Sequence, residues 1–163
     1  MALKWQEDKE FLELIEDLIE HEDVKSLEKF VHHKVTNRLA HSISVSYSSF
    51  CWARRLNLNT RAIARAGLLH DLFFYDWHTV KFVEGSHAYM HPRIAVKNAE
   101  KITVLTDLEK DIIIKHMWGA TIAFPRYKES YIVTLVDKYC AIQEACIPLK
   151  ARAKSLFHRK QFA

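Results

Sequence analysis

The stretch Ala66-Gly67-Leu68-Leu69-His70-Asp71-Leu72 places a histidine and an aspartate at the end of an apolar helical run. Burying a carboxylate without a partner costs several kcal/mol, so Asp71 needs a cation or several hydrogen-bond donors beside it. A divalent metal ion meets this need, and the adjacent imidazole of His70 can bind the same ion. The pair therefore predicts a buried metal site, for which the rest of the chain supplies further ligands.

The composition is that of a single helical domain. The chain has 163 residues, of which 49% are apolar and 27% charged, as in ordinary globular proteins. It contains only three glycines and three prolines, too few for a β fold with many turns. We therefore expect one all-α domain over residues 1–163, a bundle of about six to eight helices.

Several classes of protein are disfavoured. No apolar run approaches the roughly 18 residues that span a bilayer, and the acidic start does not resemble a secretory signal, so a cytoplasmic protein without a membrane partner is expected. Cys51, Cys140 and Cys146 form no C-x-x-C pair and are interpreted as reduced thiols. The net charge of +4 could attract phosphorylated substrates. Nucleic-acid binding would depend on the basic tail 150–160 alone and is not expected.

Apolar periodicity and capping residues predict the helices. They are expected at Phe11–Ile19, from Asp23 to about Val35, at Arg38–Leu56 and Thr60–Leu72, from Pro92 through Ile102, from the capping box at Thr106 to about Met117, and from Glu129 to about Pro148. Phe73–Tyr89 is expected to be irregular, and the basic tail 149–163 to continue as an exposed helix. The helices of residues 4–35 would pack on the core. The first of them suits a homodimer interface or intramolecular packing equally well.

Polar residues on the apolar faces of these helices form a constellation. A lone buried histidine is usually a hydrogen-bonded core residue, but here four separate helices each direct an imidazole or a carboxylate inward. The small residues beside His70 would let another helix approach closely. A shared metal site satisfies all these side chains together. The inward-facing residues are His41, His70, His116 and Asp137, with His91 at the start of the Pro92 helix.

The order His41 … His70-Asp71 … His116 … Asp137 resembles the signature of the HD-domain superfamily of metal-dependent phosphohydrolases, which have an all-helical core. The resemblance covers about residues 38–142. It is supported by three segments: Arg38-x-x-His41-Ser42-x-x-Val45, Ala66-Gly67-Leu68-Leu69-His70-Asp71 and Ile132-Val133-x-Leu135-Val136-Asp137-Lys138-Tyr139-x-Ala141.

The resemblance implies a ligand set for one or two metal ions. The first ion would be bound by His41, His70, Asp71 and Asp137. In two-metal members Asp71 would bridge to a second ion held by His91 and His116, and His91-Pro92-x-x-Ala95 is similar to the corresponding segment. His87 is a competing ligand. Imidazole and carboxylate ligands leave iron, manganese, zinc, nickel and magnesium open.

The implied reaction is hydrolysis of a phosphomonoester or phosphoanhydride by metal-activated water, with Asp71 as the central catalytic residue. The substrate would be a nucleotide or another small phosphorylated metabolite. Arg38, Arg126 and Lys128 are the candidate phosphate-binding residues.

The chain departs from the family directly after the His-Asp pair. Many relatives have a lysine there, whereas this chain has Leu72-Phe73-Phe74-Tyr75-Asp76-Trp77. Candidates for the proton donor are therefore Asp76, His78 and Lys81. Met117 follows His116, and the Gly-Tyr-Pro signature of cyclic-dinucleotide phosphodiesterases is absent, which disfavours that activity. The missing lysine leaves an alternative, a metal-containing module that senses a phosphorylated ligand without turnover.

Overall fold

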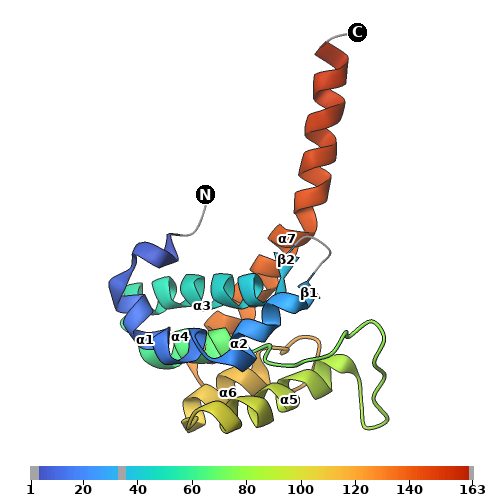
Figure 1. The fold of residues 1–163 in the computed structure, drawn as a ribbon. Coiled ribbons are helices and arrows are strands. Elements are labelled where there is room, and N and C mark those ends of the chain that lie inside the picture. Colours follow the sequence, from blue (N-terminus) through green and yellow to red (C-terminus); the bar gives the residue numbers. More distant parts are fainter. Residues whose placement is uncertain (1–3, 33–35, 162–163) are drawn as a thin grey trace.

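The computed structural model describes residues 4–32 and 36–161, which form seven α-helices (Figure 1). The predicted all-α fold is confirmed, with one addition: the two-residue strands β1 (Val31–His32) and β2 (Thr36–Asn37) form an antiparallel pair. The helices are α1 (Lys9–Ile19), α2 (Glu22–Ser26), α3 (Arg38–Arg55), α4 (Thr60–Leu69), α5 (His87–Ile102), α6 (Asp107–Lys115) and α7 (Lys128–Gln161), with 3-10 turns η1 (Trp5–Glu7) and η2 (Leu27–Lys29).

Helices α3 and α4 pack closely at the centre of the bundle. A Cβ atom on Gly67 would lie 2.9 Å from the Cα of Ser46, a distance that a real side chain does not tolerate. The hydroxyl of Ser46 donates to the carbonyl of Ala64 at 2.6 Å. The expected close approach of a helix beside His70 is therefore confirmed, and it fixes the end of α4 against α3.

The amino-terminal helix α1 packs against this core through Phe11, Ile15 and Leu18, which are fully or almost fully buried. Arg65 of α4 is also buried, and it donates from two nitrogens to the carboxylate of Asp17 at 2.5 and 2.8 Å. These contacts assign the apolar face of α1 to intramolecular packing.

The predicted second helix from Asp23 to about Val35 is wrong. Helix α2 ends at Ser26, η2 follows, and Phe30 is already extended, with φ −101° and ψ 121°. His21 caps α2 in place of Asp23, because its Nδ1 accepts the backbone N–H of Asp23 at 3.2 Å. Residues 33–35 lie outside the described part of the chain.

Two further helix ends differ from the prediction. Helix α4 ends at Leu69, so His70 and Asp71 follow it directly. Helix α5 starts at His87, so that Pro92 lies inside the helix and not in its first turn. His91 therefore belongs to the body of α5, where its side chain is buried. The predicted capping box at Thr106 and Glu109 is confirmed.

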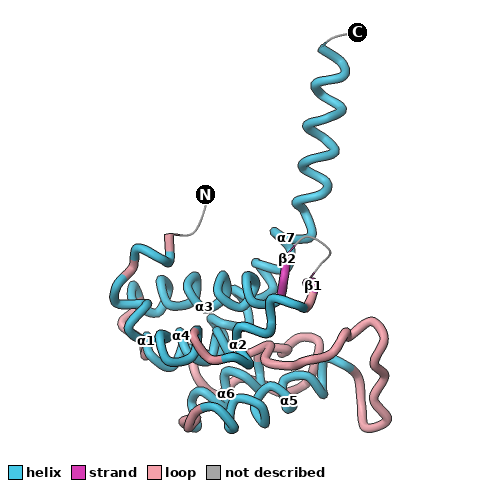
Figure 2. Tube along the Cα trace, viewed as in Figure 1, coloured by secondary structure: helices cyan, strands magenta, loops and turns pink. Residues whose placement is uncertain are grey.

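The segment between α4 and α5 and the end of α7 leave the compact body. Residues 72–86 contain no helix and form the long loop beside α5 (Figure 2). Helix α7 continues through Pro148, as expected for the basic tail, and its carboxyl-terminal part projects away from the other helices (Figure 1). None of the helices in the described part of the chain combines the length and apolar character of a membrane span.

Candidate metal centre

Six side chains that could bind a metal ion meet at the buried end of α4. They form three overlapping groups, and within each group the ligand atoms lie within 4.8 Å of one another. The groups bring together the predicted ligands from five helices or helix ends: His41, His70, Asp71, His91, His116 and Asp137.

His41 and His70 surround one end of this cluster. The Nε2 of His41 lies 3.0 Å from Oδ1 of Asp137, and the Nε2 of His70 lies 3.6 Å from the same oxygen. The Nδ1 of His70 donates to the carbonyl of Gly67 at 2.7 Å. Its buried Nε2 has no hydrogen-bond partner among the described residues. An orphaned imidazole nitrogen beside two carboxylates is the donor that a metal ion requires.

His91 and His116 form the other end of the cluster. Their Nε2 atoms lie 2.8 Å apart, while their Nδ1 atoms donate to the carbonyls of His87 at 2.9 Å and Ile113 at 2.7 Å. In neutral rings with this tautomer, two nitrogen lone pairs face each other, which is unfavourable without a cation or a proton between them. Oδ1 of Asp71 lies 3.3 Å from Nε2 of His91 and 3.8 Å from Nε2 of His116. These three side chains fit a second ion.

The electrostatics of the cluster favour the metal-binding protonation states of His116, Asp71 and Asp137. Burial, and then the neighbouring imidazoles of His91 and His70, lower the pKa of His116 to about 3, so its ring is neutral at physiological pH. Burial opposes ionisation of Asp71, but His70 and His91 hold its pKa well below the usual range. Against the same effect of burial, His41 and His70 lower the pKa of Asp137. Neutral imidazoles and ionised carboxylates are the forms that bind metal ions.

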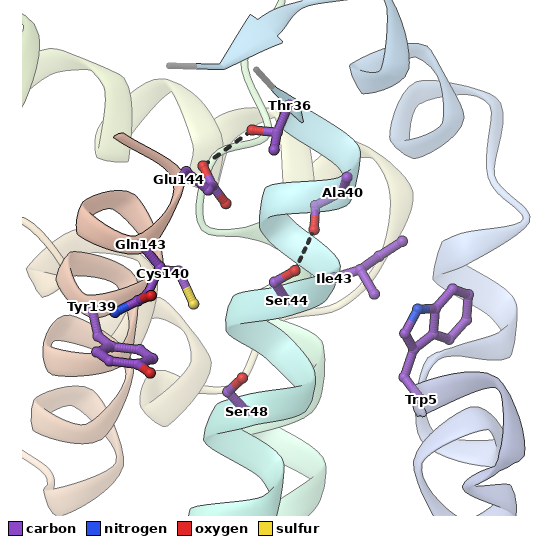
Figure 3. Close-up of a pocket in the computed structure, with 10 residues that line it drawn as sticks. All are labelled: Trp5, Thr36, Ala40, Ile43, Ser44, Ser48, Tyr139, Cys140, Gln143 and Glu144. Atoms are coloured by element: carbon purple, nitrogen blue, oxygen red, sulfur yellow. Dashed lines mark hydrogen bonds between the residues drawn. The ribbon is translucent and has the colours of Figure 1, made fainter. Parts of the chain in front are cut away.

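Glu144 supports His41 from behind the cluster. Its Oε1 lies 3.0 Å from Nδ1 of His41, and its Oε2 accepts a hydrogen bond from Thr36 (Figure 3). Burial lowers the pKa of His41, but hydrogen bonds to Asp137 and Glu144 outweigh it and raise this pKa to about 10. A carboxylate behind a ligating histidine orients the ring and increases its basicity. Sequence reasoning missed Glu144, although its position seven residues after Asp137 puts it on the same helix face.

A cavity of about 300 Å³ opens onto the cluster. Besides the ligands Asp71, His91, His116 and Asp137, its lining contains Phe73, Trp77, His87, Met117, Lys138 and Ala141.

Lys138 contributes a positively charged side chain to the lining of this cavity. Its ammonium donates to the carbonyl of His116 at 3.3 Å, and burial lowers its pKa. The sequence analysis missed Lys138 because it expected the lysine to follow His70-Asp71. The signal for Lys138 is its position directly after Asp137, the candidate ligand on α7.

His87 lines the cavity but belongs to none of the three groups of ligands. Its ring stacks on His91 with centroids 4.4 Å apart, and its Nδ1 lies 3.3 Å from the hydroxyl of Tyr75. Burial, and then His91, lower the pKa of His87 to about 4. The structure therefore places a neutral imidazole beside the cluster.

Arg38 holds the loop after Asp71. It is 1% exposed, and its two terminal nitrogens donate to the carbonyls of Phe73 at 2.6 Å and Tyr75 at 3.2 Å. Its guanidinium carbon also lies 3.6 Å from the centroid of the Phe73 ring. These contacts occupy the side chain that sequence reasoning assigned to phosphate, and Arg38 is not part of the cavity lining.

The remaining candidate residues lie away from the cavity. Arg126, just before α7, and Lys128, its first residue, are exposed, and Lys128 lies nine positions before Asp137, a rise of roughly 13 Å along the helix. In the loop, Asp76, His78 and Lys81 are exposed, and Asp76 accepts the backbone N–H of His78 at 2.9 Å. None of these five residues lines the cavity.

Comparison of the chain with protein-family models, curated proteins and solved structures finds no match. The candidate metal centre is thus defined by the positions of its own side chains.

Proposed function

We propose that the protein is a metal-dependent phosphohydrolase with a two-ion centre of the kind found in the HD-domain enzymes that it resembles. The observation that carries the proposal is the convergence of three buried imidazole nitrogens on carboxylates: Nε2 of His70 has no hydrogen-bond partner among the described residues, and Nε2 of His91 faces Nε2 of His116 beside Asp71. His41, His70, Asp71 and Asp137 would hold one ion, and Asp71, His91 and His116 the other. This mixture of imidazole and carboxylate donors suits iron, manganese, zinc or nickel better than magnesium, which prefers oxygen ligands.

Ions bound at this site would activate water and neutralise charge on a phosphoryl oxygen. The chain itself supplies Lys138, a cation at the cavity wall that can bind a second phosphate oxygen or give a proton to the leaving group. In this role Lys138 takes the place of the lysine that many relatives carry after the His-Asp pair.

The cavity also limits the substrate. Its volume of about 300 Å³ suits a small molecule, and Phe73 and Trp77 provide an aromatic wall for an apolar or planar group. A small phosphate ester or anhydride, such as a nucleotide, fits this combination of cation and aromatic surface.

The experiment begins with metal analysis of the purified full-length protein, followed by removal and replacement of the metal. Phosphate release from nucleotides and simple phosphomonoesters is then measured with Mn²⁺, Fe²⁺, Zn²⁺ and Ni²⁺. We expect about two ions per chain and metal-dependent turnover.

Asp71→Asn should lose metal and lower turnover by more than about 100-fold, since even the loss of an outer-shell partner can cost that much. The matched control is Asp76→Asn in the exposed loop, which should keep full metal content and turnover. Metal binding with tight binding of a phosphorylated ligand, but no turnover with any metal, would instead identify a sensor. A protein that binds no metal would contradict the proposal.

A further inference from the structure

Helix α7 carries an exposed apolar stripe on the side away from the metal ligands. Leu135, Tyr139 and Ile142 are 62%, 61% and 61% exposed. The spacing of four and three residues between them continues along the sequence of the helix. The residues at this spacing in the sequence are called the α7 stripe below: Leu135, Tyr139, Ile142, Cys146, Leu149, Ala153 and Leu156. Such a repeat averages 3.5 residues, which is the pattern of helices that pair in coiled coils.

The α7 stripe borders a groove between α3 and α7. One part of the groove, about 540 Å³, is lined by Trp52, Leu135 and Tyr139 among others, and Trp52 is 57% exposed. A second part, about 620 Å³, shares Ser48 and Tyr139 with the first (Figure 3). The α3 wall includes the small residues Ala40, Ser44 and Ser48, which leave room for the close approach of another helix.

The end of α7 is the element that needs a partner. It projects from the body as a single helix, and isolated helices of this length are marginal in water (Figure 1). Its sequence carries the second half of the α7 stripe, and every charged residue after Glu144 is a lysine or an arginine. Two such tails aligned in parallel would bring like charges together, so pairing of tail with tail is disfavoured.

We propose that the groove of one subunit binds residues 149–160 of a second copy of this chain, with the two α7 helices antiparallel. The continuous repeat sets the register. Leu135 would face Ala153 of the partner subunit, and Tyr139 would face Leu149 of the partner subunit. The exchange is the same in both directions, so it closes a two-fold dimer. The partner's segment would brace the helix that presents Asp137 and Glu144 to the metal centre.

The first test measures the mass of the full-length protein in solution by light scattering and sedimentation equilibrium. We expect a dimer. Ala153→Lys places a charge on the α7 stripe and should weaken the dimer by about 100-fold or more, because an unpaired charge is then buried in an apolar interface. Ala151→Lys makes the same substitution two residues away, off the stripe, and should leave the dimer intact. A monomeric wild-type protein, or equal behaviour of the two variants, would overturn the proposal.

A charge pair tests the antiparallel exchange. Leu135→Glu and Ala153→Lys should each give monomers, whereas the double variant should recover the dimer, since the glutamate of one subunit then faces the lysine of the other. In a parallel dimer the double variant would place like charges opposite each other and stay monomeric. Circular dichroism and metal content of every variant verify that the body is folded. Failure of the double variant to recover the dimer would overturn the exchange.

Discussion

The imidazole rings of the candidate metal centre are oriented in two different ways. His70, His91 and His116 each donate from Nδ1 to a backbone carbonyl. His41 instead uses its Nδ1 on the carboxylate of Glu144. A carbonyl fixes a ring, whereas a carboxylate also makes the opposite nitrogen a stronger donor to a metal ion. Glu144 is thus a positioning residue whose charge has a separate, measurable effect.

Glu144→Gln should weaken metal binding by about 10- to 100-fold, because glutamine keeps an acceptor for His41 but removes the charge. The measurement is a competition between the protein and a chelator of known affinity. The same exchange at the exposed Glu13 of α1 is the control and should change nothing. Equal affinities of Glu144→Gln and the wild-type protein would refute the role given to this carboxylate.

Lys138 allows binding of substrate to be separated from binding of metal. Lys138→Met should lower kcat/KM for phosphate release by about 10- to 100-fold, the cost of one charge-assisted hydrogen bond, with metal content unchanged. Lys97→Met on the exposed side of α5 serves as the control, with wild-type kinetics expected. An unaltered kcat/KM in Lys138→Met would remove Lys138 from the proposed mechanism.

At the scale of the helices, the contact between α3 and α4 positions the centre. Helix α3 carries His41, and His70 and Asp71 follow α4 directly, so the distance between the two helices sets the distance between their ligands. Gly67 makes the contact close enough, because its missing Cβ leaves space for the backbone of Ser46. Because the atom that faces Gly67 is a backbone atom of α3, it cannot move aside as a flexible side chain could.

Gly67→Ala should therefore destabilise the protein by about 1–3 kcal/mol through overpacking, despite the higher helix propensity of alanine. Chemical denaturation measures the free energy of unfolding. Gly85→Ala is the control: its new Cβ would meet only the half-exposed side chain of Tyr89, which can move. A Gly67→Ala variant as stable as the wild-type protein would show that the helices separate without cost.

At the scale of the whole molecule, the candidate metal centre joins distant parts of the chain. Its candidate ligands come from α3, the end of α4, α5, the end of α6 and α7, which together span most of the sequence. Bound ions would link all these elements, whereas the hydrogen bonds among the six side chains in the described part of the chain join only His41 to Asp137 and His91 to His116.

Removal of metal should consequently lower the melting temperature of the full-length protein. An ion present at about 1,000 times its dissociation constant stabilises the fold by about 4 kcal/mol, equivalent to roughly 10 °C for a domain of this size. The measurement is thermal unfolding with Mn²⁺ and with a chelator. Asp71→Asn should show little difference between the two conditions. An identical response of the variant and the wild-type protein would place the stabilising ion elsewhere.

Local sequence patterns predicted most of the helices, because apolar periodicity and capping depend on neighbouring residues. Thr106 and Glu109 formed the expected capping box, and Asn59 accepts from the N–H of Ala62 at the start of α4. The predictions were wrong where the local sequence is compatible with two different backbone structures. Pro92 is tolerated inside α5, and after α2 the chain forms the turn η2 and then the strand β1 in place of a longer helix.

The sequence by itself determined the inward-facing ligands, since a histidine or aspartate on an apolar helix face must find a partner in the core. Only the tertiary structure decided which residues surround them. It turned Arg38 toward the loop carbonyls and placed Arg126, Lys128, Asp76, His78 and Lys81 away from the cavity. It also brought Lys138 and Glu144 to the site. A charged side chain near a motif can be stabilised by solvent, by backbone carbonyls or by the site itself. Which of these it contacts depends on the packing of helices that are far apart in sequence.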